Sequence, residues 1–83
     1  MYEVKFSTCA EKQFLSLDRK MQERIVSVLK RIRIRPFSFV KRLSGNPYYR
    51  LRVGDYRLIV DIKQKELAIL VIEIGHRKNV YDI

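Results

Sequence analysis

The spacing of the apolar residues changes near the middle of this chain, and that change constrains the fold more than any other feature. In the first half, one set recurs every three or four positions: Met21, Ile25, Val28, Leu29 and Ile32. This period is typical of one face of an amphipathic helix. Over residues 48–62, large apolar residues recur at every second position, which indicates strands with one buried face, and residues 67–74 are apolar on both faces, as a central strand would be. The sequence therefore predicts an α+β domain.

Shorter signals set the limits of the elements before Pro36. Alternation over residues 2–6 predicts a first strand. Thr8 and Glu11 have the spacing of a capping box, so a helix is expected from Thr8 to about residue 17. Asp18 is the expected N-cap of a second helix. Pro36 ends that helix, because proline cannot donate the next helical hydrogen bond.

The second half of the chain predicts three strands. Residues 37–47 look irregular and contain a turn cluster around Gly45. Strands are expected over 48–53, 56–62 and 67–74, with Gly54-Asp55 as a tight turn and Gly75 ending the last strand. The expected order is β-α-α-β-β-β in one domain, residues 1–83. A helical hairpin would pack on one face of a small, mostly antiparallel, four-stranded sheet.

Charge is concentrated in the middle of the chain. The 83 residues include 18 Lys and Arg against 9 Asp and Glu, a net charge of +9. Residues 30–57 hold nine of the basic residues and one acidic residue, so this stretch carries a net charge of +8. Such clustering suggests a polyanionic partner, with RNA or DNA as the first choice, and the alternative is a basic protein that its charge keeps soluble.

Other residue counts exclude several classes. A single cysteine, Cys9, rules out an intrachain disulfide framework and a multi-cysteine zinc site. We expect no metal and no cofactor. The N-terminus lacks the apolar core of a signal peptide, and no run approaches the ~18 apolar residues of a membrane span. The expected location is the cytoplasm, without a membrane partner.

Basic side chains are predicted to gather on one face of the sheet. Arg50 and Arg52 are two positions apart on a strand and therefore share a face. A tight hairpin brings Arg57 onto the adjoining strand. The segment after Gly75 supplies four further residues that the last strand would deliver to the rim of the same face: His76, Arg77, Lys78 and Tyr81. The alternatives are that the strand arginines form a solvated face and that His76 is an ordinary surface residue.

Such a face suits cleavage of RNA by attack of its own 2′-OH. Arginine binds phosphate in a bidentate manner and stays charged. Fixed cations stabilise the charge that develops on the phosphate. The reaction also needs a base and an acid, for which His76 and Tyr81 are the titratable candidates.

Three segments together resemble the RelE/ParE toxin superfamily, most closely its RelE branch. They are Leu43–Gly45, Tyr49–Leu58 ("YRLRVGDYRL") and Gly75–Tyr81 ("GHRKNVY"). The resemblance covers almost the whole chain, since length and element order match too. It implies a RelE-like fold. It also implies a toxin of a type II toxin–antitoxin system, an endoribonuclease that cleaves mRNA in the ribosomal A site without a metal.

The resemblance also assigns roles to individual residues. Arg50 and Arg52 would grip the RNA backbone, and Arg57 and Arg77 would stabilise the transition state. Tyr81 would orient the substrate or transfer a proton. The expected RNA-binding residues are Lys41, Arg42, Arg50, Arg52 and Lys78.

One departure from the family pattern affects the general base. The best-known RelE-type site has lysine at both positions that Arg50 and Arg52 occupy here, and lysine is the favoured base there. An arginine guanidinium does not readily give up its proton. His76 is then the first candidate base and Tyr81 the second, while His76 could instead anchor the C-terminal segment.

The implied partners are a RelB-like antitoxin, the ribosome and mRNA, and contact with promoter DNA through the antitoxin complex is left open. Two alternative functions remain at this point. One is a ParE-like toxin that inhibits DNA gyrase and is not a nuclease. The other is a simple basic RNA-binding module.

Overall fold

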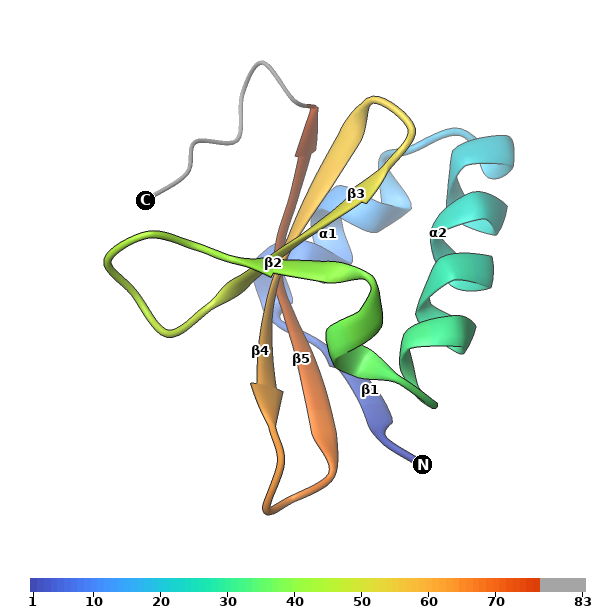
Figure 1. The fold of residues 1–83 in the computed structure, drawn as a ribbon. Helices are drawn as coiled ribbons and strands as arrows, with labels where there is room; N and C mark the ends of the chain where they lie inside the picture. Colours follow the sequence, from blue (N-terminus) through green and yellow to red (C-terminus); the bar gives the residue numbers. More distant parts are fainter. Residues whose placement is uncertain (77–83) are drawn as a thin grey trace.

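The computed structural model describes residues 1–76, which form five strands, two α-helices and one short 3₁₀ helix (Figure 1). Their bounds are β1 Glu3–Phe6, α1 Thr8–Leu15, α2 Arg19–Ile32, η1 Pro36–Ser38, β2 Val40–Arg42, β3 Tyr49–Val53, β4 Tyr56–Lys63 and β5 Ala68–His76. The strands form one sheet in the order β1-β5-β4-β3-β2. Neighbouring strands are antiparallel except β1 and β5, which are parallel. The predicted α+β class is confirmed, and the prediction of four strands is wrong.

The additional strand is β2, in the stretch that the sequence predicts to be irregular. It has three residues and pairs with β3, with Lys41 opposite Arg50. A strand this short offers too few positions for an alternating pattern to be recognised. This strand adds a basic residue to the predicted arginine face, because it places Lys41 next to Arg50.

Both helices begin at a side-chain cap. The N-cap of α1 is Ser7 rather than the predicted Thr8: Ser7 Oγ accepts a hydrogen bond from Ala10 N at 3.0 Å. The same hydroxyl donates to Ile72 O at 2.7 Å, which ties the start of α1 to β5. The helix ends at Leu15, two residues earlier than expected.

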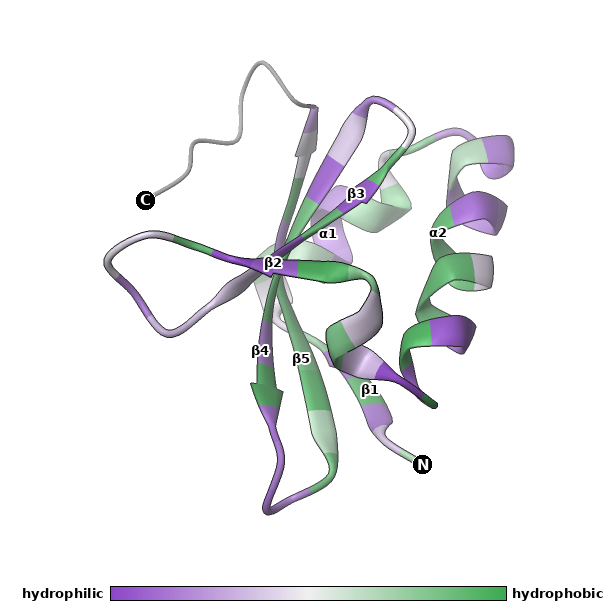
Figure 2. Ribbon diagram, in the orientation of Figure 1, coloured by the Kyte–Doolittle hydropathy of each residue, from purple (hydrophilic) through white to green (hydrophobic). Residues whose placement is uncertain are grey.

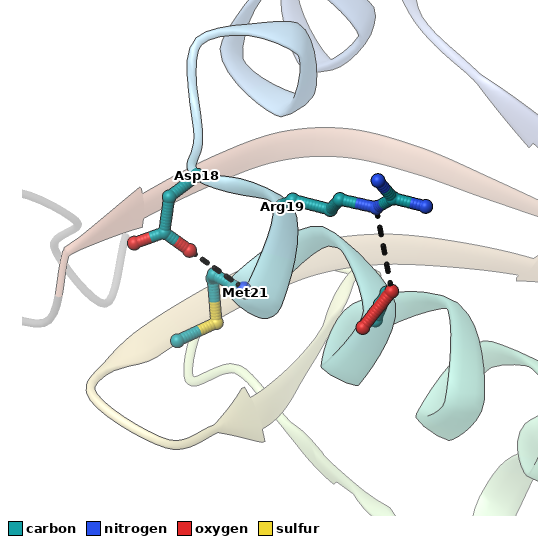
Figure 3. A network of polar contacts seen from close by, with 4 residues as sticks. Asp18, Arg19 and Met21 are labelled. Atoms are coloured by element: carbon teal, nitrogen blue, oxygen red, sulfur yellow. Dashed lines mark hydrogen bonds and ion pairs between the residues drawn. The ribbon is translucent and has the colours of Figure 1, made fainter.

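Asp18 caps α2 as predicted. Its Oδ1 accepts a hydrogen bond from Met21 N at 2.8 Å (Figure 3). Arg19 Nε lies 3.6 Å from Glu23 Oε2 on the next turn, and Figure 3 also draws this ion pair as a dashed line. A cap of this kind stabilises a helix by about 1 kcal/mol. The surface ion pair adds less, because both side chains are exposed.

The helices cover one face of the sheet and enclose the main core. Figure 2 shows the side of α2 that faces the sheet as apolar and the outer side as largely polar. The buried residues of this core come from both helices and from three strands: Ala10, Ile25, Leu29, Ile32, Leu51, Val53, Leu58, Val60, Ile69, Val71 and Ile74. The helical hairpin predicted on one face is confirmed. No helix within residues 1–76 is long and apolar enough to cross a membrane.

β5 differs from the prediction in its end and in its regularity. The strand continues through Gly75 to His76 instead of ending before Gly75. It also contains a bulge, since Val60 pairs with Val71 while the adjacent Ile59 pairs with Glu73. β1 pairs with β5 only as far as Val71. Beyond that point α1 supplies a partner: Gln13 Oε1 accepts a hydrogen bond from Ile74 N at 2.6 Å.

Candidate functional site

Four basic side chains from three neighbouring strands converge on the face of the sheet that the helices leave open. Lys41 pairs with Arg50 across β2 and β3, and Arg52 pairs with Arg57 across β3 and β4. Their neighbours in sequence, such as Leu51 and Leu58, point into the core on the other side. The prediction that Arg50, Arg52 and Arg57 share a face is therefore confirmed.

These side chains line a hollow of about 140 Å³. We call it the basic hollow; its lining consists of Phe39, Lys41, Arg50, Arg52 and Arg57. Among these described residues there is no carboxylate. The hollow is large enough to admit a phosphate group, with four cations converging on it.

The described residues of the basic hollow bring like charges together. Like charges directly opposite each other on adjacent strands destabilise a sheet, and Arg52 and Arg57 are such a pair. A bound phosphate would reverse the sign of that contribution, because arginine forks match phosphate oxygens in charge and geometry. The tight turn that creates the pair depends on Gly54, whose φ of +59° fits the first position of a type II′ hairpin.

Two further arginines of the basic stretch lie elsewhere. Arg42, predicted to bind RNA, pairs with Tyr49 in the sheet, and its guanidinium lies 6.0 Å from the centre of that ring. Tyr49 packs against the main core, so Arg42 is outside the basic hollow. Arg33 is structural: its Nε donates to Tyr2 O at 3.0 Å, and its carbonyl accepts from Tyr2 N.

The prediction that His76 lies at the rim of the arginine-bearing face is wrong. His76 pairs with Tyr56 across β4 and β5, and the two rings meet edge to face with their centres 5.5 Å apart. Tyr56 packs against the main core under the helices. His76 therefore lies on the helix-covered side, whereas its neighbour Gly75 pairs with Arg57 on the open face.

Three predicted site residues, Arg77, Lys78 and Tyr81, lie outside the described residues. Their assignment stays a prediction. Within residues 1–76, no group of three or more His, Cys, Asp or Glu side chains is placed to hold a metal ion.

Another hollow, of about 290 Å³, lies between α2 and the β3–β4 turn. Arg24, Arg31 and Arg52 contribute its charge, so Arg52 borders both hollows. The sequence reasoning overlooked Arg24, although its separation from Arg31 by seven residues places both on one stripe of the helix. A Cβ at Gly54 would come within 3.0 Å of the Arg24 guanidinium, so glycine there also makes room for Arg24.

Phe39 was overlooked as well, because the stretch around it carries no recognisable pattern. It follows the short helix η1 and is about half exposed, at 47%. It is the one uncharged residue among the described residues that line the basic hollow.

Solved structures with the same fold include several toxin–antitoxin complexes. An archaeal RelE–RelB complex from Pyrococcus horikoshii OT3 is 27% identical, with a TM-score of 0.82, and the match covers 95% of this chain and 98% of that chain. The intact E. coli RelBE complex is 22% identical, with a TM-score of 0.81 and coverage of 92% and 96%. A YoeB/ParE toxin from Agrobacterium tumefaciens is 16% identical, with a TM-score of 0.77 and coverage of 89% and 96%. No curated protein matches the sequence.

The fold and these likenesses define a member of the RelE/ParE toxin superfamily, as the sequence motifs predict. Within it, the chain belongs to the family described as the ParE toxin of the type II toxin–antitoxin system, parDE, whose model matches residues 4–81. The protein is therefore a type II toxin.

Proposed function

We propose that this toxin is an endoribonuclease that cleaves mRNA in the A site of the ribosome. The observation that carries the proposal is the pairing of Arg52 with Arg57 in the basic hollow, beside Lys41 and Arg50. Cations around a space of phosphate size can stabilise the charge that develops at phosphorus without a metal. The likeness to a RelE toxin of 27% identity supports the same assignment.

In the proposed reaction, the 2′-oxygen of one nucleotide attacks the adjacent phosphorus. The new O2′–P bond forms as the P–O5′ bond breaks, leaving a 2′,3′-cyclic phosphate and a 5′-hydroxyl. A base takes the 2′ proton, and an acid protonates the leaving 5′-oxygen. Arg57 stabilises the negative charge on the pentacovalent phosphate, while Lys41, Arg50 and Arg52 hold the backbone on either side.

The position of His76 in the structure changes which residue is the first candidate for the general base. Because His76 lies against Tyr56 on the helix-covered side, it is poorly placed to reach a phosphate in the basic hollow. Tyr81 is then the candidate that the family resemblance leaves, with Arg77 as a second stabilising cation. A site without a strong base depends on the ribosome to align the RNA.

A RelB-like antitoxin is the proposed protein partner, by likeness to the RelE–RelB complexes. It should be acidic or amphipathic, because the toxin combines a net charge of +9 with exposed apolar residues such as Ile34 and Phe37. The complex could contact promoter DNA through the antitoxin. The proposed substrate places the toxin in the cytoplasm.

Inhibition of DNA gyrase is the second candidate function. The observation in its favour is the family model itself, which describes a ParE toxin. A gyrase inhibitor would use the basic surfaces for binding alone and would need no group aligned for chemistry at phosphorus.

Two assays on the purified toxin separate these functions. With ribosomes stalled on a defined mRNA, we expect cuts within the A-site codon, mapped by primer extension, and almost none on the same RNA without ribosomes. Arg57→Gln should abolish the cuts, and Arg19→Gln, which removes an equal charge on α2, should not. Absence of cuts together with inhibited supercoiling by gyrase would replace the nuclease assignment with the second candidate.

A further inference from the structure

Phe39 is in an unusual position for a large apolar side chain. It follows η1 immediately before β2 begins, and it lines the basic hollow together with Lys41, Arg50, Arg52 and Arg57. With 47% of its surface exposed, it gains only part of the free energy that full burial of a phenylalanine provides. What the position does offer is an aromatic ring beside a phosphate-sized cluster of cations.

Phe37, two residues earlier, provides the comparison. Its exposure is similar, at 43%, yet its ring meets Tyr49 edge to face with the centres 5.5 Å apart. Tyr49 packs against the main core, so Phe37 has an evident packing role at the rim of that core. Phe37 does not line the basic hollow. The two phenylalanines therefore have like exposure and different surroundings.

A single-stranded nucleic acid presents phosphates and flat bases in alternation. A protein that binds one combines basic groups for the backbone with aromatic rings on which bases stack. The basic hollow and Phe39 are that combination at the scale of one nucleotide. An acidic antitoxin segment is the other conceivable occupant, but one exposed ring beside several cations matches the alternation of base and phosphate in a nucleic acid.

We propose that Phe39 stacks on a nucleobase of the RNA whose backbone occupies the basic hollow. This inference rests on the proposed function and adds to it a residue that positions the substrate. Stacking fixes the nucleotide's rotation about the bound phosphate, and correct rotation is what in-line attack by the 2′-oxygen demands. Because every base has a π-face, the contact is tolerant of sequence.

A fluorescence experiment tests the contact directly. The chain contains no tryptophan, so Phe39→Trp creates a single reporter, and Phe37→Trp is the matched control. Each variant is titrated at low salt with a 2′-O-methyl RNA oligonucleotide, which cannot be cleaved, and with an abasic strand of equal length and charge. We expect strong quenching only for Phe39→Trp with the strand that has bases. Equal responses from the two variants, or from the two strands, would overturn the proposal.

Binding measurements with Phe39→Ala and Phe39→Leu complete the test. Loss of base stacking should weaken binding of the normal strand by about 5- to 150-fold and leave binding of the abasic strand unchanged. Leucine keeps apolar bulk without a π-face, so it should rescue little. Unchanged RNA binding by Phe39→Ala, with or without lost binding to the antitoxin, would contradict the inference.

The outcomes are separable from those of the proposed function. Base-dependent quenching without any ribosome-dependent cleavage would support stacking by Phe39 and overturn the nuclease assignment. Cleavage that proceeds equally in the wild type and in Phe39→Ala would support the nuclease assignment and overturn the stacking contact.

Discussion

The two faces of the sheet are built from the same strands and have opposite contents. Arg57 and Leu58 are consecutive in β4, yet Arg57 lines the basic hollow while Leu58 is fully buried under the helices. β3 repeats the contrast with Arg50 and Leu51. Alternation along a strand thus separates the residues that hold the fold from those that meet the ligand. The separation predicts that stability and activity can be changed independently by mutating adjacent positions.

The largest effect on stability is expected on the helix-covered face. Leu58→Ala removes a fully buried side chain and should lower the free energy of unfolding by about 2–5 kcal/mol. Leu15→Ala makes the same change at an exposed position of α1 and should alter stability by less than about 0.5 kcal/mol. Urea unfolding followed by circular dichroism measures both. Similar losses for the two variants would mean that Leu58 does not anchor the core.

The next largest effect is expected on the open face, where activity should fall without a loss of stability. Arg57→Gln should reduce the single-turnover rate of mRNA cleavage on ribosomes by about 10²–10³-fold, the usual cost of losing one preorganised charge at the transition state. The free energy of unfolding in urea should not fall, and it should rise by about 0.2–1 kcal/mol because one of two facing like charges is removed. A comparable rate loss in Arg19→Gln would show that net charge, and not the position of Arg57, is what matters.

Arg52→Gln should change stability and binding in opposite directions. It removes one of two like charges that face each other across β3 and β4, so the free energy of unfolding should rise by about 0.2–1 kcal/mol. Binding of RNA should weaken, and the salt dependence should fall by about one phosphate contact. Lys65→Gln, in the exposed β4–β5 turn, is the control for lost charge. A stability decrease in Arg52→Gln would refute the idea that Arg52 and Arg57 repel each other across the two strands.

The parts of the site that could be predicted follow from short-range geometry. Period-2 alternation places Arg50 and Arg52 on one face, and a two-residue turn fixes where Arg57 must lie relative to them. The helix limits near Asp18 and Pro36 depend on caps and on the chemistry of proline, which are also local. These features need no knowledge of distant contacts.

The parts that failed depend on contacts between distant segments. The bulge in β5 inserts one extra residue, Ile72, and this decides which face Ile74 and His76 occupy. Because β5 is apolar on both faces, the bulge cannot be recognised from the sequence pattern. β2 exists because β3 offers an edge to pair with, and its three residues carry no signal of their own. Phe39 acquires its neighbours through that same pairing, so sequence reasoning had no means to find it.

The smallest expected effect concerns His76 and tests the sharpest difference between sequence and structure. A general base contributes about 10²–10⁴-fold to a rate, so a catalytic His76 would lose at least that much on substitution. Because its ring lies against Tyr56 on the helix-covered side, we expect His76→Phe to change cleavage on ribosomes far less. Phenylalanine keeps an aromatic edge-to-face contact with Tyr56 and removes both nitrogens, so it separates packing from proton transfer. Single-turnover cleavage across a range of pH checks this, with Tyr56→Phe as the partner variant. A 100-fold loss in His76→Phe alone would return His76 to the reaction and require the C-terminal half of β5 to rearrange when RNA binds.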